Sequence, residues 1–377
     1  MSAIASQELL HTPEGVRDLY GKEYAAKRAV TGALHRQMAL YGYEDIQTPT
    51  FEFFDVFSRE IGTTPSRELY KFIDKDGSTL VLRPDFTPSV VRCAARYDRD
   101  ETAPLRFCYE GSAFVNTSSL QGKLKETTQT GVELMNEGSV EADGEVIALL
   151  ISALRSAGLE KFQISVGNVE YFKGLCQSLA LDSETEELLR AEISGKNYFA
   201  AERLLIDRGV GEKERAALLQ VTEYIGQEEA LRAAGEAAGN ARSQAAVERL
   251  RGLYEVLRAY RLEKYVSFDL SMLNRYNYYT GVIFKAYTHG VGDAIASGGR
   301  YDTLCAHFGK EAAAIGMVIQ VDALLEALRR QQIAVATPPA PVEIAYTDET
   351  YAQALQKAQA LRANGTAAVL RKAVKGR

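Results

Sequence analysis

The sequence predicts an α+β protein built around an antiparallel sheet with flanking helices. Short strand-like segments stand on both sides of a long stretch, about residues 183–260, in which strand formers are sparse and Ala, Glu, Leu and Arg dominate. A proline-rich segment then separates a small strand–helix–strand pattern at the end of the chain. Strands that flank a helical insertion in this way favour one sheet-centred domain over a regular βαβ alternation.

The first half of the chain alternates helices with short strands. Residues 20–41 predict an amphipathic helix with Val30, Leu34 and Met38 on one stripe, ended by Gly42. A second helix is expected at Glu145–Ala157, closed by Gly158. The expected strands are Thr79–Leu82, Arg106–Tyr109, Thr127–Leu134 and Phe162–Val166.

The helical insertion at about 183–260 is either a spacer or an interaction module, with equal support for both. Strands return after it, and a helix follows that uses Leu324, Leu325 and Leu328 as its apolar positions. The strands expected here are Tyr265–Leu270, Tyr278–Tyr287 and Ala313–Gln320.

Residues 337–341 form a stiff linker with three prolines. A strand at Val342–Tyr346, a helix at Thr350–Ala363 and a strand at Ala367–Leu370 come after it. This unit is too small for an independent sheet domain, so it resembles a domain cut short. We therefore expect a main domain over residues 1–334 and a short α/β segment over 342–377.

Composition narrows the functional classes. A formal net charge of −6 argues against broad nucleic-acid binding, and no apolar run reaches the ~20 residues of a membrane span. The N-terminus lacks the pattern of a signal peptide. The scattered cysteines form no CxxC pair and the four histidines show no ligand spacing. We expect a reduced, cytoplasmic protein without metal or cofactor.

Residues 82–88, LRPDFTP, follow an expected strand and carry the first candidate site. Pro84 and Pro88 stiffen a loop that presents the carboxylate of Asp85 and the hydroxyl of Thr87. This pair suits an ammonium group, although a purely structural turn is the simpler explanation of this segment taken alone.

Two tyrosines and a glycine pair supply the second candidate site. Tyr278 and Tyr279 are adjacent on an expected strand, so one would line a pocket while the other packs, and which one faces inward is open. Gly298 and Gly299 allow close backbone approach to a ligand, or else form a hairpin turn.

The third candidate site lies on the strand that contains Gln129, Gly131 and Glu133. Alternate residues of a strand share one face, so the amide and the carboxylate could bind one polar ligand. The alternative is the solvated face of an edge strand.

Together these segments resemble the core of the class II histidyl-tRNA synthetases from about residue 12 to 330. Residues 12–18, TPEGVRD, are similar to the opening of that family, and 41–49 resemble class II motif 1, its dimer-forming helix and strand. Residues 278–281, YYTG, and 298–302, GGRYD, resemble its histidine-pocket signatures. The resemblance implies that histidine binds at Asp85, Thr87, Gln129, Glu133, Tyr278, Tyr279 and Tyr301.

The resemblance fails where the synthetases place the arginines that stabilise charge on ATP. The motif 2 loop reads AFVNTSS over 113–119, with Asn116 at its centre and no cation before Lys123. Motif 3 has Gln320 and Ala323 where a glycine and an arginine are expected, and the catalytic arginine before the tyrosine pair aligns with Asn274. Arg275 is one position away; on a strand it would face the other side, whereas a bulge or loop would restore it. Loss of one such contact costs a factor of ~10²–10³ in rate. An adenylating enzyme is therefore not expected, and the shortened C-terminus makes tRNA binding doubtful.

A synthetase-like fold with a histidine pocket but without ATP arginines is similar to the regulatory subunits of the short-form ATP phosphoribosyltransferase, the first enzyme of histidine biosynthesis. That similarity implies a non-catalytic subunit that dimerises through motif 1, joins the catalytic subunit in a hetero-octamer and takes part in histidine feedback. The alternatives are an active histidyl-tRNA synthetase and a stand-alone histidine-binding or scaffold protein.

Overall fold

A computed structural model gives the structure of the chain and describes residues 10–57, 64–117, 123–273 and 278–373. The chain divides into two compact units, Met1–Val335 and Ala336–Arg377. In the described residues no helix is both long and apolar enough to span a membrane.

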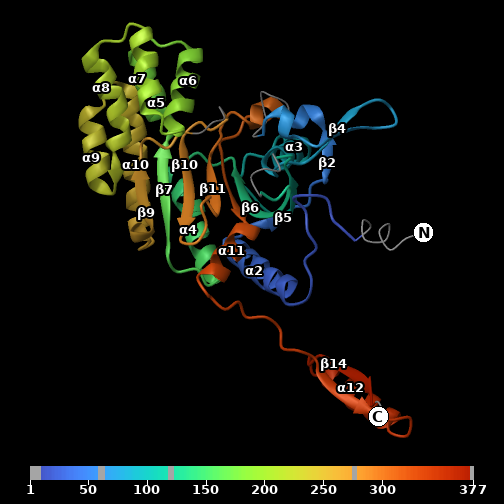
Figure 1. Cartoon of the computed structure of the whole chain (residues 1–377). Coiled ribbons are helices and arrows are strands. Elements are labelled where there is room, and N and C mark those ends of the chain that lie inside the picture. Colours follow the sequence, from blue (N-terminus) through green and yellow to red (C-terminus); the bar gives the residue numbers. More distant parts are fainter. Residues whose placement is uncertain (1–9, 58–63, 118–122, 274–277, 374–377) are drawn as a thin grey trace. The chain divides into compact units, whose positions relative to one another are not determined.

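A nine-stranded sheet forms the centre of the first unit (Figure 1). Its strand order is β1-β5-β6-β12-β11-β10-β7-β9-β8, and neighbouring strands are antiparallel except in the pairs β1/β5 and β7/β9. The strands are β1 (Glu44–Asp45), β5 (Leu105–Phe114), β6 (Glu126–Met135), β7 (Phe162–Asn168), β8 (Ile225–Gly226), β9 (Val266–Asp269), β10 (Val282–Thr288), β11 (Ala296–Arg300) and β12 (Ala314–Gln320). The predicted mixed α+β class with an antiparallel sheet is confirmed.

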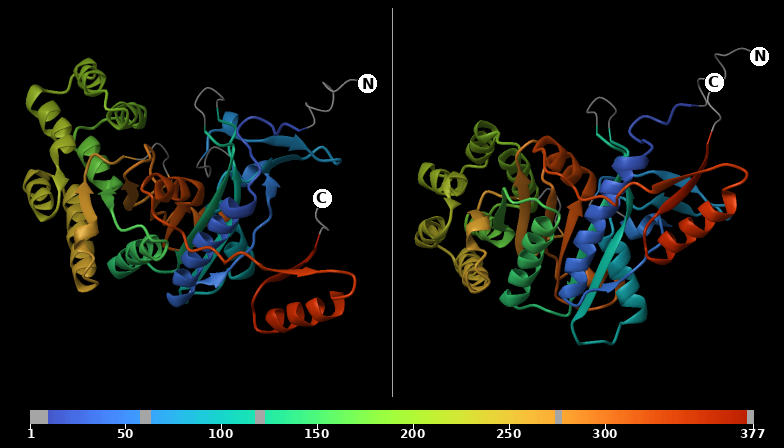
Figure 2. Two further views of the ribbon diagram at one scale, coloured as in Figure 1. Left: turned by 60° about the horizontal axis from the view of Figure 1, so that its bottom comes forward. Right: turned by 90° about the horizontal axis from the view of Figure 1, so that it is seen from below.

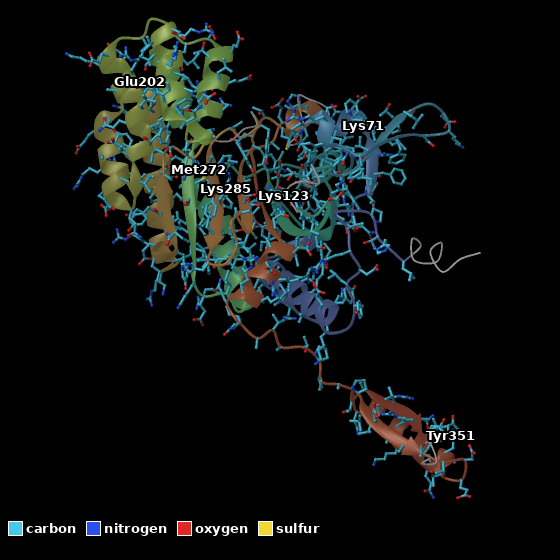
Figure 3. All side chains as sticks on the ribbon, in the orientation of Figure 1. Lys71, Lys123, Glu202, Met272, Lys285 and Tyr351 are labelled. Carbon is cyan, nitrogen blue, oxygen red and sulfur yellow. The ribbon has the colours of Figure 1, made fainter. Side chains whose placement is uncertain are left out.

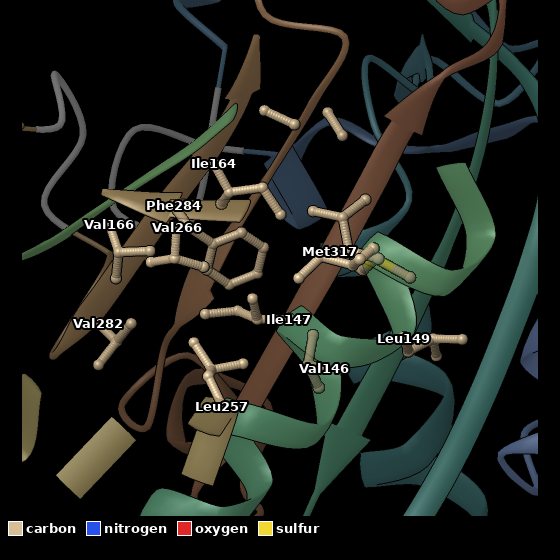
Figure 4. Close-up of a cluster of buried hydrophobic side chains, with 14 of the residues drawn as sticks. Val146, Ile147, Leu149, Ile164, Val166, Leu257, Val266, Val282, Phe284 and Met317 are labelled. Carbon is tan, nitrogen blue, oxygen red and sulfur yellow. The ribbon is translucent and has the colours of Figure 1, made fainter. Parts of the chain in front are cut away.

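Helices cover one face of this sheet and build the main core against it. These helices are α2 (Gly21–Leu40), α4 (Val140–Ser156), α10 (Ala241–Ala259) and α11 (Val321–Arg330). Figure 4 shows Ile147 of α4 and Leu257 of α10 among Phe284 and Met317 of the sheet, all of them buried. Because successive strand residues point to opposite faces, the neighbours Lys285 and Gly316 belong to the other face.

The insertion lies at one end of the sheet, beside β7, β9 and β10, in all three views of Figures 1 and 2. It is helical as predicted, apart from the short 3-10 turn Gln220–Glu223 and β8. Its remaining helices are α6 (Ser183–Ser194), α7 (Tyr198–Asp207), α8 (Glu212–Leu219) and α9 (Glu228–Ala237). The sequence did not predict α5 (Val169–Ser178), which precedes the insertion and packs against α10.

A small second sheet of order β2-β4-β3 stands beside the main one. It consists of β2 (Phe51–Phe53), β3 (Lys71–Ile73) and β4 (Thr79–Leu82). Helix α3 (Thr87–Tyr97) follows β4 after a four-residue connection, and Pro88 occupies its first turn. Proline is tolerated there because first-turn amides have no helical acceptor. Of the segment predicted as a loop, residues 83–86 form this connection, whereas Leu82 ends β4 and Thr87 and Pro88 already belong to α3.

Three sequence-based interpretations need correction. The strand with Gln129 and Glu133 is not an edge strand, because β6 pairs with both β5 and β12. Gly298 and Gly299 do not form a turn, since both lie inside β11. Tyr278 and Tyr279 are not on a strand, because β10 begins only at Val282. The alternation argument therefore does not apply to the tyrosine pair.

The second unit contains β13 (Val342–Tyr346), α12 (Tyr351–Ala363) and β14 (Ala368–Lys372). Its two strands are parallel, as a strand–helix–strand connection allows. The buried residues Ile344, Ala354 and Ala358 form its small core.

Candidate functional site

A cavity of about 270 Å³ opens on the face of the main sheet opposite α2, α4, α10 and α11, and the start of α3 contributes to its lining. All seven residues that the histidyl-tRNA synthetase resemblance singled out line this one cavity: Asp85, Thr87, Gln129, Glu133, Tyr278, Tyr279 and Tyr301. They come from segments up to 216 positions apart in the chain, from Asp85 to Tyr301. The strand order β6-β12-β11-β10 joins these segments.

Glu133 is the centre of a hydrogen-bond group at one end of the cavity. Its side chain is fully buried on β6 and accepts a hydrogen bond of 2.7 Å from the Thr87 hydroxyl, which the start of α3 holds in place. The Tyr301 hydroxyl donates to the other carboxylate oxygen. Burial raises the pKa of Glu133 to about 8, although these two donors oppose the shift. The group thus holds an acid that is easily protonated near neutral pH.

Asp85 lies close to this group, but its carboxylate has no hydrogen-bond partner among the described residues. Both oxygens are buried. Burial raises the pKa of Asp85 to about 7, and the nearby Thr87 amide lowers it only partly, without reaching hydrogen-bonding geometry. The Gln129 side-chain oxygen is also buried without a donor. Such groups are costly to bury, so these acceptors favour a ligand that brings donors.

Tyrosines form one wall of the cavity. The rings of Tyr278 and Tyr279 lie 4.1 Å apart, and Tyr278 lies 6.2 Å from Tyr301. Both members of the adjacent pair line the cavity, so the expectation that only one does is wrong. Tyr109, which the sequence did not single out, also lines the cavity and stacks on Phe86 at 4.4 Å. Flat aromatic walls of this kind suit a planar ligand group.

Glycines form the floor of the cavity. Gly299 of β11 pairs with Gly316 of β12, which pairs with Glu133. A methyl group at Gly316 would collide with the Glu133 carboxylate, and one at Gly299 would lie 2.7 Å from the Tyr279 ring. The floor therefore leaves room for the side chains that surround a ligand.

Positive charge is scarce at the cavity. In the described part of the chain, Lys285 of β10 is the one cation among the lining residues. Arg83 neighbours Asp85 in sequence, but it donates to the carbonyls of Thr48 and Ser112. Lys123 pairs with Asp293 at 3.4 Å. Figure 3 labels Lys123 and Lys285.

Arg300 belongs to one of the pocket signatures, yet its side chain lies on the helix-covered side of the sheet. It forms an ion pair of 2.7 Å with the fully buried Asp143 of α4, which Arg249 of α10 contacts at 2.7 Å as well. Arg300 also donates to Asp302 at 3.0 Å. This group, Asp143, Arg249 and Arg300, is called the charge cluster below.

The structure describes two of the three places at which the synthetases are expected to carry ATP-contacting arginines, those of motif 2 and motif 3. Asn116 is exposed, and its amide donates to the Glu68 carbonyl. Gln320 lines the cavity, and Ala323 packs against the core from α11. Asn274 lies outside the described residues.

His35, Asp45 and Cys108 place their donor atoms within 4.8 Å of one another. The histidine pairs with Asp45 at 2.7 Å, and the Cys108 thiol lies 3.5 Å from the same oxygen. Burial and the adjacent Asp45 raise the pKa of Cys108 to about 12, which disfavours the thiolate that metals prefer. Direct contacts therefore explain this trio.

Sequence reasoning missed Tyr109, Lys285 and the role of Gly316. The sequence offered one signal, the alternation of side chains along a strand, which places Lys285 on the same face as Ile283. Tyr109 lies beside Gly131 only because β5 pairs with β6. Strand pairing was needed to bring both to the cavity.

Comparison with known proteins gives consistent results. A family model described as histidyl-tRNA synthetase matches residues 15–324. A protein of Acetivibrio thermocellus named ATP phosphoribosyltransferase regulatory subunit is 38% identical over 95% of this chain and 86% of its own length. A Bacillus halodurans structure, described as an ATP phosphoribosyltransferase regulatory subunit/histidyl-tRNA synthetase, superposes with a TM-score of 0.89. It is 32% identical and covers 98% of this chain and 94% of its own.

A histidyl-tRNA synthetase from Nostoc sp. PCC 7120 superposes with a TM-score of 0.81 at 20% identity, over 97% of this chain and 86% of its own. At that identity the similarity establishes the fold alone. The class II synthetase-like fold predicted from the sequence is confirmed.

Proposed function

From the premise that the chain belongs to the histidyl-tRNA synthetase family and, within it, to the ATP phosphoribosyltransferase regulatory subunits, we propose that it regulates a catalytic ATP phosphoribosyltransferase of the short form. In this role the chain performs no chemistry itself. It is required for the activity of its partner at the first step of histidine biosynthesis and mediates feedback by histidine. The observation that carries the proposal is the kinship over 95% of the chain with subunits of that name.

The cavity supports histidine as the regulatory ligand. Asp85 offers an unpaired carboxylate for the ammonium group, and Thr87 lies beside it. Glu133 can accept from an imidazole N–H, and the tyrosines give that ring flat neighbours. Gln129 supplies one more acceptor. Regulation then requires that histidine bind one conformation of the assembly better than another.

The assembly itself also belongs to the proposal. We infer a self-dimer through motif 1, the segment around α2 and β1, and a hetero-octamer with the catalytic subunit. The protein works in the cytoplasm, and neither tRNA nor a membrane is among its partners. A complex with the catalytic subunit is the part that the names of the relatives support directly.

Reconstitution tests the proposal. The short-form catalytic subunit from the same cells, assayed with ATP and phosphoribosyl pyrophosphate, should be inactive or weak alone and active once this chain is added. Addition of histidine should then reduce the rate. Failure of the two chains to co-purify, together with an unchanged rate, would contradict the regulatory role.

An active histidyl-tRNA synthetase is the second candidate, because the amino-acid side of the pocket is intact. Histidine-dependent exchange of pyrophosphate into ATP measures that activity directly. We expect none, because the cavity has no arginine among its described lining residues. A stand-alone histidine-binding protein would bind histidine but neither exchange pyrophosphate nor activate the catalytic subunit.

A further inference from the structure

Lys285 lines the cavity from β10 and is half-buried there. Its ammonium group has no ion-pair or hydrogen-bond partner among the described residues. A lysine that is partly removed from water without a carboxylate partner is costly, so an anionic group from outside the chain would stabilise it.

The acidic groups of the cavity lie toward the other end. Asp85 and Glu133 are at the α3 and β6 side, whereas Lys285 lies beyond β12 and β11. Strand pairing defines the separation, because Lys285 pairs with Ser297, Ser297 with Val318, and Val318 with Gly131. Negative and positive groups thus face each other across one cavity floor.

The separation suits a small ligand. Three strand spacings, about 14 Å, and an offset of two residues, about 7 Å, lie between the main chains of Lys285 and Glu133. Both residues line the cavity, so their side chains shorten this separation. The space between the Glu133 carboxylate and the Lys285 ammonium therefore fits a ligand of the size of one amino acid. It is too short for a nucleotide.

We propose that Lys285 binds the carboxylate of the bound amino acid, so that the cavity selects a free α-amino acid and rejects the corresponding amine. This proposal rests on the histidine ligand proposed above and adds the group that sets its selectivity. Gln320, which stands where the motif 3 glycine of the synthetases is expected, also lines the cavity with a half-buried side chain and supplies a neutral donor. The carboxylate is thus bound at Lys285, and the ammonium at Asp85.

Calorimetry with histidine and histamine tests this assignment, because histamine keeps the imidazole and the ammonium but lacks the carboxylate. Both are titrated into the full chain and into the variants K285Q, K285R and K123Q. We expect K285Q to weaken histidine about 10- to 100-fold, the range of a hydrogen bond to a charged group, and to leave histamine unchanged. K285R should retain most of the affinity for histidine.

Lys123 is the matched control, because it pairs with Asp293 and does not line the cavity. K123Q should change neither affinity. Equal weakening of histidine and histamine by K285Q, or a selective loss in K123Q, would overturn the proposal. Titration with inorganic phosphate tests whether Lys285 instead binds another anion. If K285Q abolishes phosphate binding but leaves the affinity for histidine unchanged, the proposal is also overturned.

Calorimetry and the reconstitution assay together separate the role of Lys285 in histidine binding from the regulation of the catalytic subunit. If the wild-type chain binds no histidine but still activates the catalytic subunit, the role of Lys285 is wrong and the regulatory role stands. If histidine binds with the predicted selectivity but the catalytic subunit is not activated, Lys285 is supported and the regulatory role is wrong.

Discussion

Two groups of buried carboxylates lie on opposite sides of β11, and their partners differ. Asp143 in the charge cluster is contacted by Arg249 and Arg300 at 2.7 Å each. Among the residues that the structure describes, Asp85 in the cavity has no hydrogen-bond partner and Glu133 has only hydroxyl donors. The carboxylates of both groups are buried, so each loses the free energy of hydration of its charge. The difference is that the carboxylate of the charge cluster is paired within the fold, whereas the cavity keeps acceptors that the proposed ligand would pair with.

This comparison distinguishes structural from functional burial of charge. A carboxylate that is paired inside the chain stabilises the fold only while both partners are present. A carboxylate that is left unpaired reduces stability and is available for binding. Substitutions in the two groups should therefore have opposite consequences.

Removal of Asp143 should have the largest effect. Asp143→Ala removes the fully buried carboxylate between Arg249 and Arg300 and leaves Arg300 with the half-exposed Asp302 alone. Loss of one partner of a buried pair costs about 3–5 kcal/mol. Chemical denaturation measures the free energy of unfolding. Glu326→Ala is the control, because Glu326 pairs with Arg329 and Arg330 at the surface and should cost less than about 1 kcal/mol. Similar losses for both variants would mean that the buried ion pairs of Asp143 stabilise the fold no more than the surface pairs of Glu326.

Gly316→Ala should abolish ligand binding with a smaller effect on the fold. The added methyl group would collide with the Glu133 carboxylate and lie 2.9 Å from the Val132 carbonyl oxygen. We expect histidine affinity to fall by at least about 100-fold, equivalent to about 3 kcal/mol. Gly252→Ala is the control, since a methyl group in that helix meets nothing closer than 3.4 Å. Normal histidine binding by Gly316→Ala would show that the floor does not shape the site.

Asp85→Asn should reduce binding without a loss of stability. The variant removes the charge that the ligand ammonium would pair with, which should weaken histidine about 10- to 100-fold. The fold loses an unpaired buried charge, so its free energy of unfolding at pH 8 should be unchanged or higher. Asp143→Asn, measured in parallel, should be destabilised. A destabilised Asp85→Asn protein would mean that Asp85 has a structural partner after all.

The dependence of stability on pH gives the smallest effect when it is expressed per pH unit. Because the pKa of Asp85 is raised to about 7 in the folded chain, the folded state keeps a proton that the unfolded state loses near pH 4. Stability from this group is therefore highest below about pH 4 and falls as pH rises to about 7. Relative to Asp85→Asn, the wild type should lose up to about 1.4 kcal/mol per pH unit in this window. Urea denaturation at pH 5, 6, 7 and 8 measures it, and an identical slope in both proteins would contradict the buried, unpaired state of Asp85.

Much of this arrangement could be predicted from the sequence, because local patterns carry it. The apolar stripe of Val30, Leu34 and Met38 predicted α2, and the loss of strand formers predicted the helical insertion. The seven cavity residues were named from motifs, and the structure brings them together. Whether they bind histidine stays a prediction.

The parts that could not be predicted depend on non-local pairing. Nothing near Gln129 indicates that β6 lies between β5 and β12, so the edge-strand alternative could not be rejected. The start of α3 at Thr87 was hidden by two prolines that also suit a turn. Lys285 falls within the strand expected over Tyr278–Tyr287, but only its pairing with Ser297 places it on the cavity face. Tertiary context decided each of these cases.

Arg300 and Tyr301 are consecutive residues, and a single peptide plane joins the two groups compared above. The Arg300 side chain is fixed to α4 and, through Asp143, to α10 at the base of the insertion, while the Tyr301 hydroxyl contacts Glu133 in the cavity. Asp302 and Thr280 fix the same strand end: the Thr280 amide donates to the Arg300 carbonyl at 2.8 Å, and the Asp302 amide donates to the Thr280 hydroxyl at 2.9 Å. The backbone of these two residues therefore has one side-chain contact on each side of the sheet. A ligand that displaced Tyr301 would act on the same backbone that carries Arg300, and through Asp143 on α4 and α10.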